Sequence, residues 1–126
     1  MAHTALRSIG AVLAGFVTVA VLSIAADALL EAVGIFPPPS EGLFVTWMLA
    51  LALLYRCAFT VLGGYVTARL APTAPVRHAI ILGIIGTVAA IIGTIVGWDL
   101  SAHWYPLALA VTGLPCTWLG GKLGAR

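Results

Sequence analysis

Apolar residues fill four long stretches of the chain, and polar residues are concentrated in the short segments between them. The stretches 9–26 and 79–98 contain no Asp, Glu, Lys or Arg. Each is close to the roughly 20 residues that a helix needs to cross the hydrocarbon core of a bilayer. The pattern therefore predicts four transmembrane helices, at about residues 8–33, 42–70, 77–98 and 104–123.

Proline and glycine mark the expected helix ends. The prolines at 37–39 follow Gly34 and should end the first helix, because proline lacks an amide donor and disfavours helical geometry in the residue before it. Ser40 has the side-chain oxygen of an N-cap, and Glu41 suits the positive end of a helix dipole. Either residue can therefore start the second helix, and Pro115 is expected to kink the fourth.

Charged residues are sorted by sign along this pattern. Acidic residues occupy one set of helix ends and the loops beyond them, whereas all basic residues but one occupy the opposite set. The two groups are Asp27, Glu31, Glu41 and Asp99, and Arg7, Arg69, Arg77, Lys122 and Arg126. Because Lys and Arg remain on the cytoplasmic side during insertion, we expect an all-α, polytopic membrane protein with two helical hairpins and both termini in the cytoplasm (N-in/C-in).

The composition agrees with a membrane protein. Hydrophobic residues make up 62% of the chain and charged residues 8%, whereas soluble domains are about a quarter charged and about half apolar. Four spans and their connections use up the 126 residues, so we expect a single transmembrane domain over residues 1–126. The net charge of +2 is small and dispersed, and the topology alone accounts for the basic residues, so we expect no nucleic-acid partner.

The N-terminal region has an alternative interpretation. Arg7, the apolar run and the small-residue pattern at residues 26–28 resemble a secretory signal with a cleavage site. The uncharged run 9–26 is longer than the about 7–15 residues typical of a signal peptide. Its length favours a retained transmembrane helix.

Signatures of metal binding, cofactor binding and catalysis are not found in the sequence. Cys57 and Cys116 lie inside apolar stretches without a Cys-x-x-Cys motif, so we expect free, packed thiols. His78 and His103 belong to opposite membrane faces and cannot share a metal or a haem. No hydrolase elbow, zinc-protease motif or phosphate-binding loop occurs. We expect no metal, no cofactor and no enzymatic activity.

Arg56 is the one basic residue in the middle of a predicted span. A guanidinium at that depth costs about 2.5–3.5 kcal/mol on insertion scales, so it needs a partner. Arg56 lies roughly 20 Å above Arg69 and Asp27 roughly 30 Å above Arg7, by the rise of a helix. Because arginine side chains can extend toward the interface, Asp27 is the expected partner and Glu31, one turn farther out, the second candidate.

Two interpretations of this charge pair remain open. The pair could fix the register of the first two helices as a purely structural element. Alternatively, it could line a polar cavity that binds an anionic headgroup or a small solute, or that relays a proton.

Glycines mark the expected helix contacts. Gly93-x-x-x-Gly97 is a close-approach pattern in an apolar segment, and it suggests that neighbouring backbones can touch there. The full set of glycines expected at helix contacts is Gly63, Gly64, Gly83, Gly86, Gly93 and Gly97.

Residues 62–69 and 119–126 form a candidate internal repeat, with five of eight positions identical at an offset of 57. A duplication would relate two parallel hairpins by an axis along the membrane normal. Convergence is the alternative, because such residues are common at cytoplasmic helix ends and the first and third helices show no comparable match.

Two parts of the chain resemble a group of small four-helix bacterial membrane proteins. They are residues 55–72, which contain Tyr55-Arg56 and Gly63-Gly64-Tyr65, and the later Trp104-Tyr105-Pro106. The resemblance implies a location in the bacterial inner (cytoplasmic) membrane and brings no activity with it. We expect an accessory, structural or self-associating membrane component, with the lipid bilayer and other membrane subunits or a second copy as partners. The alternative is a small transporter or a lipid- or solute-binding protein that uses Arg56 and Asp27.

Overall fold

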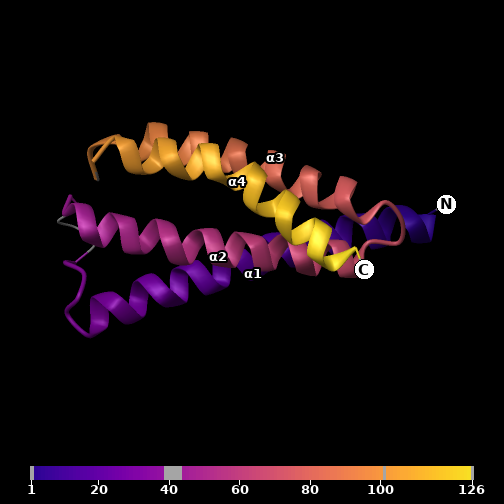
Figure 1. Ribbon diagram of the computed structural model, residues 1–126, viewed down its shortest axis with the longest axis horizontal. Coiled ribbons are helices and arrows are strands. Elements are labelled where there is room, and N and C mark those ends of the chain that lie inside the picture. Colours follow the sequence, from indigo (N-terminus) through magenta and orange to yellow (C-terminus); the bar gives the residue numbers. More distant parts are fainter. Residues whose placement is uncertain (1, 39–43, 101, 126) are drawn as a thin grey trace.

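The computed structural model describes residues 2–38, 44–100 and 102–125, and it is all-helical (Figure 1). Four long helices follow one another along the chain: α1 (Ala2–Ala32), α2 (Thr46–Leu70), α3 (Pro75–Val96) and α4 (Trp104–Gly124). A short 3-10 helix, η2 (Trp98–Leu100), lies between α3 and α4. The four helices form two hairpins, α1 with α2 and α3 with α4.

The helix boundaries differ from the expected ones at several ends. α1 begins at Ala2 and not near residue 8, because the residues before Ser8 include good helix formers and nothing that breaks a helix. It ends at Ala32, two residues before Gly34, whose φ of 83° is left-handed. α2 begins at Thr46. The expected start of this helix, at Ser40 to Gly42, lies outside the described residues.

α3 and α4 also differ slightly from expectation. α3 begins at Pro75, where the fixed φ of proline suits the first helical turn, and it ends at Val96. Trp98, expected in this helix, belongs to η2 instead. α4 continues through Pro115 and bends along its length (Figure 1), as proline inside a helix is expected to cause.

The two hairpins are close together at one end of the bundle and separate toward the other (Figure 1). Both chain termini and the α2–α3 connection lie at the close end. α2 and α4 make the most extensive helix contact, whereas α1 and α3 touch each other sparsely. α2 and α4 therefore form the central pair, and α1 and α3 flank it.

Three of the helices in the described part of the chain are long and apolar enough to cross a membrane. They are α2, α3 and the segment Thr4–Ala32 of α1. Only 17–22% of the residues in their most apolar segments are buried inside the bundle. Large side chains such as Leu54, Ile95 and Val96 are 69–81% exposed. Apolar surface on this scale is typical of contact with lipid and not with water.

Glycines allow the close contact between α2 and α4. A Cβ atom at Gly64 would overlap the backbone of Thr117, and one at Gly120 would overlap the carbonyl oxygen of Val61. On the other side of α2, a Cβ at Gly15 of α1 would overlap Thr67. The backbones of these helices therefore approach one another at distances that other residues could not reach.

The two repeated glycine pairs make different contacts. Gly63 faces α1 and Gly64 faces α4, whereas Gly120 faces α2 and Gly121 faces Ala79 of α3. In the first pair, the first glycine contacts the partner helix of its own hairpin and the second contacts the opposite hairpin. In the second pair, the first glycine contacts the opposite hairpin and the second contacts the partner helix of its own hairpin. Equivalent positions of the candidate repeat do not make equivalent contacts.

His78 connects the beginning of α3 to α1. Its Nδ1 lies 3.0 Å from the carbonyl oxygen of Ala74, which can only accept a hydrogen bond, so Nδ1 is the donor. In the neutral ring Nε2 then accepts from the Ser8 hydroxyl, 2.8 Å away. This buried histidine holds the close end of the bundle together.

Replacing Gly120 with alanine is expected to destabilise the bundle. Overpacking typically costs about 1–3 kcal/mol, more than the helix propensity gained by alanine. The matched control is Gly10→Ala, because a Cβ atom at Gly10 meets nothing within 4 Å. Thermal unfolding in detergent measures the difference, and equal stability of the two variants would contradict the α2–α4 contact.

Candidate functional site

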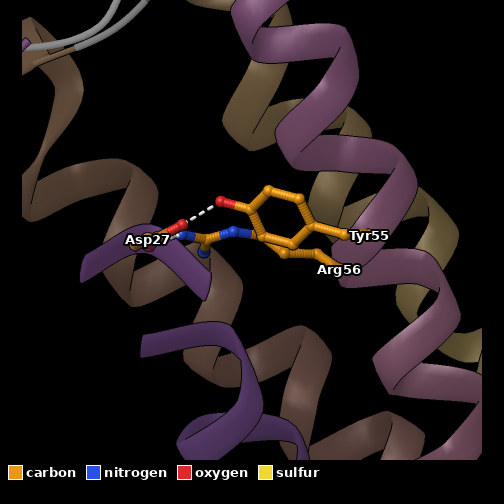
Figure 2. Close-up of polar contacts among 3 residues, drawn as sticks. All are labelled: Asp27, Tyr55 and Arg56. Atoms are coloured by element: carbon orange, nitrogen blue, oxygen red, sulfur yellow. Dashed lines mark hydrogen bonds and ion pairs between the residues drawn. The ribbon is translucent and has the colours of Figure 1, made fainter. Parts of the chain in front are cut away.

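Asp27, Tyr55 and Arg56 form a polar cluster between α1 and α2 (Figure 2). A terminal guanidinium nitrogen of Arg56, Nη2, donates to Oδ2 of Asp27 in an ion pair. The Tyr55 hydroxyl donates to Oδ1 of the same carboxylate. The structure thus brings together Asp27 and Arg56, as expected from the need to partner a charge in the membrane, and both oxygens of the carboxylate are engaged.

The cluster depends on the reach of two consecutive long side chains. Tyr55 and Arg56 leave the α2 backbone in directions about 100° apart, yet Figure 2 shows both converging on Asp27. The carbonyl oxygen of Arg56 accepts a hydrogen bond from the Thr60 hydroxyl at 2.7 Å. Glu31, the second candidate partner, lies one turn beyond Asp27 in α1. The second contact to the Asp27 carboxylate comes from Tyr55.

Tyr105 is a further member of the site. The centre of its ring lies 5.9 Å from Cζ of Arg56, within the range of a cation–π interaction. Tyr105 is only 9% exposed and packs in an apolar cluster with Phe36, Leu49 and Ala52. A tyrosine in the first turn of a membrane helix is also typical of an interfacial anchor, and no sequence signal distinguishes that role from this one.

The charge pair is neutral overall but retains an unused donor. The side chains of Arg56 and Asp27 are 29% and 27% exposed. Within the described structure, the Nε atom of Arg56 is buried and has no hydrogen-bond partner. A buried donor without a partner costs about 1–3 kcal/mol. Because Nε is enclosed, only the exposed part of the Arg56 side chain is open to a ligand.

A partly open cavity of about 570 Å³ adjoins the pair, and all four helices line it. Its α1 wall includes Phe16, Ala20, Ser23 and Asp27, and its α3 wall includes Gly83, Gly86, Ala90, Gly93 and Gly97. Spacings of three and four residues place each set on one face of its helix. Because α1 and α3 touch sparsely, the cavity is the space between them, with α2 and α4 behind it.

The glycines expected at helix contacts divide into two groups. Gly63 packs against α1, and Gly64 and Gly83 pack against α4. A Cβ atom at Gly86 or Gly93 would meet nothing within 4 Å, and both residues line the cavity. Gly97 follows the last residue of α3 and also lines the cavity. The face that carries Gly93 and Gly97 therefore borders the cavity instead of another helix.

The thiols of Cys57 on α2 and Cys116 on α4 are free and lie near each other. The sequence left open whether they touch. Among the described residues, no group of three or more His, Cys, Asp or Glu side chains is placed to hold a metal ion.

The proximity of the thiols predicts a cross-link within one chain. Mild oxidation, in which the two thiols lose two hydrogens to the oxidant, is expected to link Cys57 to Cys116 and thus α2 to α4. Mass spectrometry of the digested protein detects the linked peptides, and Cys57→Ser is the control. Two thiols that react freely with maleimide but never with each other would contradict this packing.

Comparison with protein-family models, with curated proteins and with solved structures found no match. The function is therefore argued from the cavity and the residues that line it.

Proposed function

We propose that this chain is a four-helix integral membrane protein that binds a small amphipathic molecule in the cavity between α1 and α3. The observation that carries the proposal is the position of the Asp27–Arg56 pair, which lines a cavity of about 570 Å³. Ligand sites in proteins are typically about 300–1,000 Å³, mostly apolar, with a few polar groups. This cavity has that size and composition.

The surroundings of the pair favour binding over a purely structural role. A pair that only fixed helix register would be enclosed by packed side chains, with its hydrogen-bonding groups satisfied. Here the side chains of Arg56 and Asp27 are 29% and 27% exposed, and the opposite wall contains Gly86 and Gly93 with open space before them. These features support a site that accommodates a ligand.

The proposal includes α4 as a fourth span and an N-in/C-in topology in a bacterial inner membrane. α4 is not among the helices that reach the hydropathy expected of a span, and it contains Pro106 and Pro115, but its 21 residues reach about 32 Å and it packs along α2 and α3. Arg7, Arg69 and Lys122 lie near the close end of the bundle, which is the arrangement expected for a cytoplasmic end.

The test is to extract the tagged protein from its native membrane in a polymer nanodisc and to identify co-purifying molecules by mass spectrometry. We expect one small amphipathic molecule per chain, retained through washing. Retention of only bulk lipid in membrane proportions would contradict the proposal.

A second candidate function is an accessory or self-associating membrane component. It is favoured by the same Gly86 and Gly93 face, because small residues that contact nothing within the chain can receive a helix from another chain. A stoichiometric protein partner in the same extraction would support this candidate instead.

A further inference from the structure

The cavity changes from polar to apolar along its length. Asp27, Arg56 and Tyr105 line the end where the hairpins separate. Phe16 and Leu82 line the other end, toward the chain termini. Polar Thr117 also lies there, but its hydroxyl already bonds carbonyl oxygens of its own helix, at 3.0 and 3.2 Å. An occupant would therefore have a polar group at one end and an apolar body at the other.

The cavity extends along the helices. Its α3 wall runs from Gly83 to Gly97, which is about 21 Å at the rise of a helix. An extended chain that enters at the polar end could follow this wall along its length.

The hydrogen-bonding groups at the polar end select the head of the occupant. Both oxygens of the Asp27 carboxylate already accept hydrogen bonds, from Tyr55 and Arg56. The Arg56 guanidinium has five N–H donors and no acceptor, one of its terminal nitrogens bonds Asp27, and its side chain is 29% exposed where it lines the cavity. The head should consequently be a hydrogen-bond acceptor, such as a carboxylate, an ester carbonyl or a phosphate oxygen. An alkylammonium head offers no acceptor to the guanidinium and would bring a like charge beside it.

We propose that the ligand is a single-chain acyl amphiphile whose acceptor head lies at Arg56 and whose tail extends between α1 and α3 toward Phe16 and Leu82. This inference rests on the proposed function and adds the class and the orientation of the ligand. The polar end lies away from the chain termini, so the amphiphile would enter from the leaflet on that side. In the proposed topology this is the outer leaflet.

The test uses the full-length protein, delipidated in detergent, and native mass spectrometry with three probes of equal chain length. These are a fatty acid, a lysophospholipid and an alkylammonium. We expect one bound fatty acid or lysophospholipid per chain, and at least tenfold weaker binding of the alkylammonium. If the fatty acid binds more tightly, the acceptor is a free carboxylate. If the lysophospholipid binds more tightly, the acceptor belongs to a phospholipid head.

A variant tests the position of the head. Asp27→Asn combined with Arg56→Gln removes the charges but keeps side chains of similar size, and it should weaken acyl binding at least tenfold. Lys122→Gln is the matched control, because Lys122 lies at the opposite end of the bundle, where its Nζ is 5.1 Å from the centre of the Trp118 ring. If the double variant fails to fold, the three probes on the wild-type protein still decide the question.

The outcomes separate this inference from the proposed function. Equal binding of alkylammonium and fatty acid would overturn the assignment of the head to Arg56 but leave an amphiphile site. A tightly retained molecule without an acyl chain would overturn the ligand class alone. Failure of every probe, together with a native extract that contains no retained small molecule, would overturn both.

Discussion

Replacement of Arg56 alone with leucine is expected to destabilise the protein more than replacement of Arg56 and Asp27 together. The single change leaves the Asp27 carboxylate with Tyr55 but without its counter-ion. Breaking a buried ion pair by removing one partner typically costs about 3–5 kcal/mol, whereas replacing both partners with apolar residues is often neutral. In the membrane the stranded charge also carries an insertion cost of a few kcal/mol.

The measurement is the fraction of folded protein during unfolding in mixed detergent, for the wild type, both single variants and the double variant. Tyr55→Phe is a useful comparison, because it removes one hydrogen bond to the same carboxylate and should cost about 1.5–3 kcal/mol, less than the stranded charge. A double variant as unstable as Arg56→Leu would show that the pair itself, and not the stranded charge, holds α1 and α2 together.

Filling the cavity is expected to abolish ligand binding without unfolding the protein. Gly86→Leu and Gly93→Leu place side chains in a space where a Cβ atom meets nothing within 4 Å. Both positions line the cavity, so the new side chains would occupy the volume of the ligand. We expect at least a tenfold loss of the retained molecule, measured by mass spectrometry of the purified protein.

Gly10→Leu is the matched control for this experiment. Gly10 is also a helical glycine with nothing within 4 Å, but it is not among the residues that line the cavity. The control should retain the ligand at the level of the wild type. Cavity-filling variants that retain as much ligand as Gly10→Leu would place the binding site elsewhere.

The sequence allowed good prediction of the helices and of the ion pair. Four apolar stretches bounded by proline and glycine gave helices close to the observed ones, because these boundaries depend on local chemistry. Asp27 could be identified as the partner of Arg56 because a charge within the membrane must be neutralised and helix rise fixes its depth. The early start of α1 was missed, since no residue near Ser8 marks a boundary.

The cavity could not be predicted, because it depends on the distance between α1 and α3. The spacing of Gly93 and Gly97 is the same whether a helix packs against them or leaves them open, so the pattern alone could not distinguish a contact from a wall. Tyr105 was missed for a similar reason. Its role depends on the direction in which the first turn of α4 faces, which is set by packing against α2.

Site-specific photo-cross-linking at Ala90 tests the central claim most directly. Ala90 lies on the α3 wall of the cavity, and a photoreactive amino acid there would react with whatever occupies the space in the native membrane. Ile95, which is 74% exposed, is the comparison position. A small amphipathic adduct found at Ala90 and absent at Ile95 is the predicted result. A cross-linked protein at Ala90, or the same bulk lipids at both positions, would contradict a ligand site between α1 and α3.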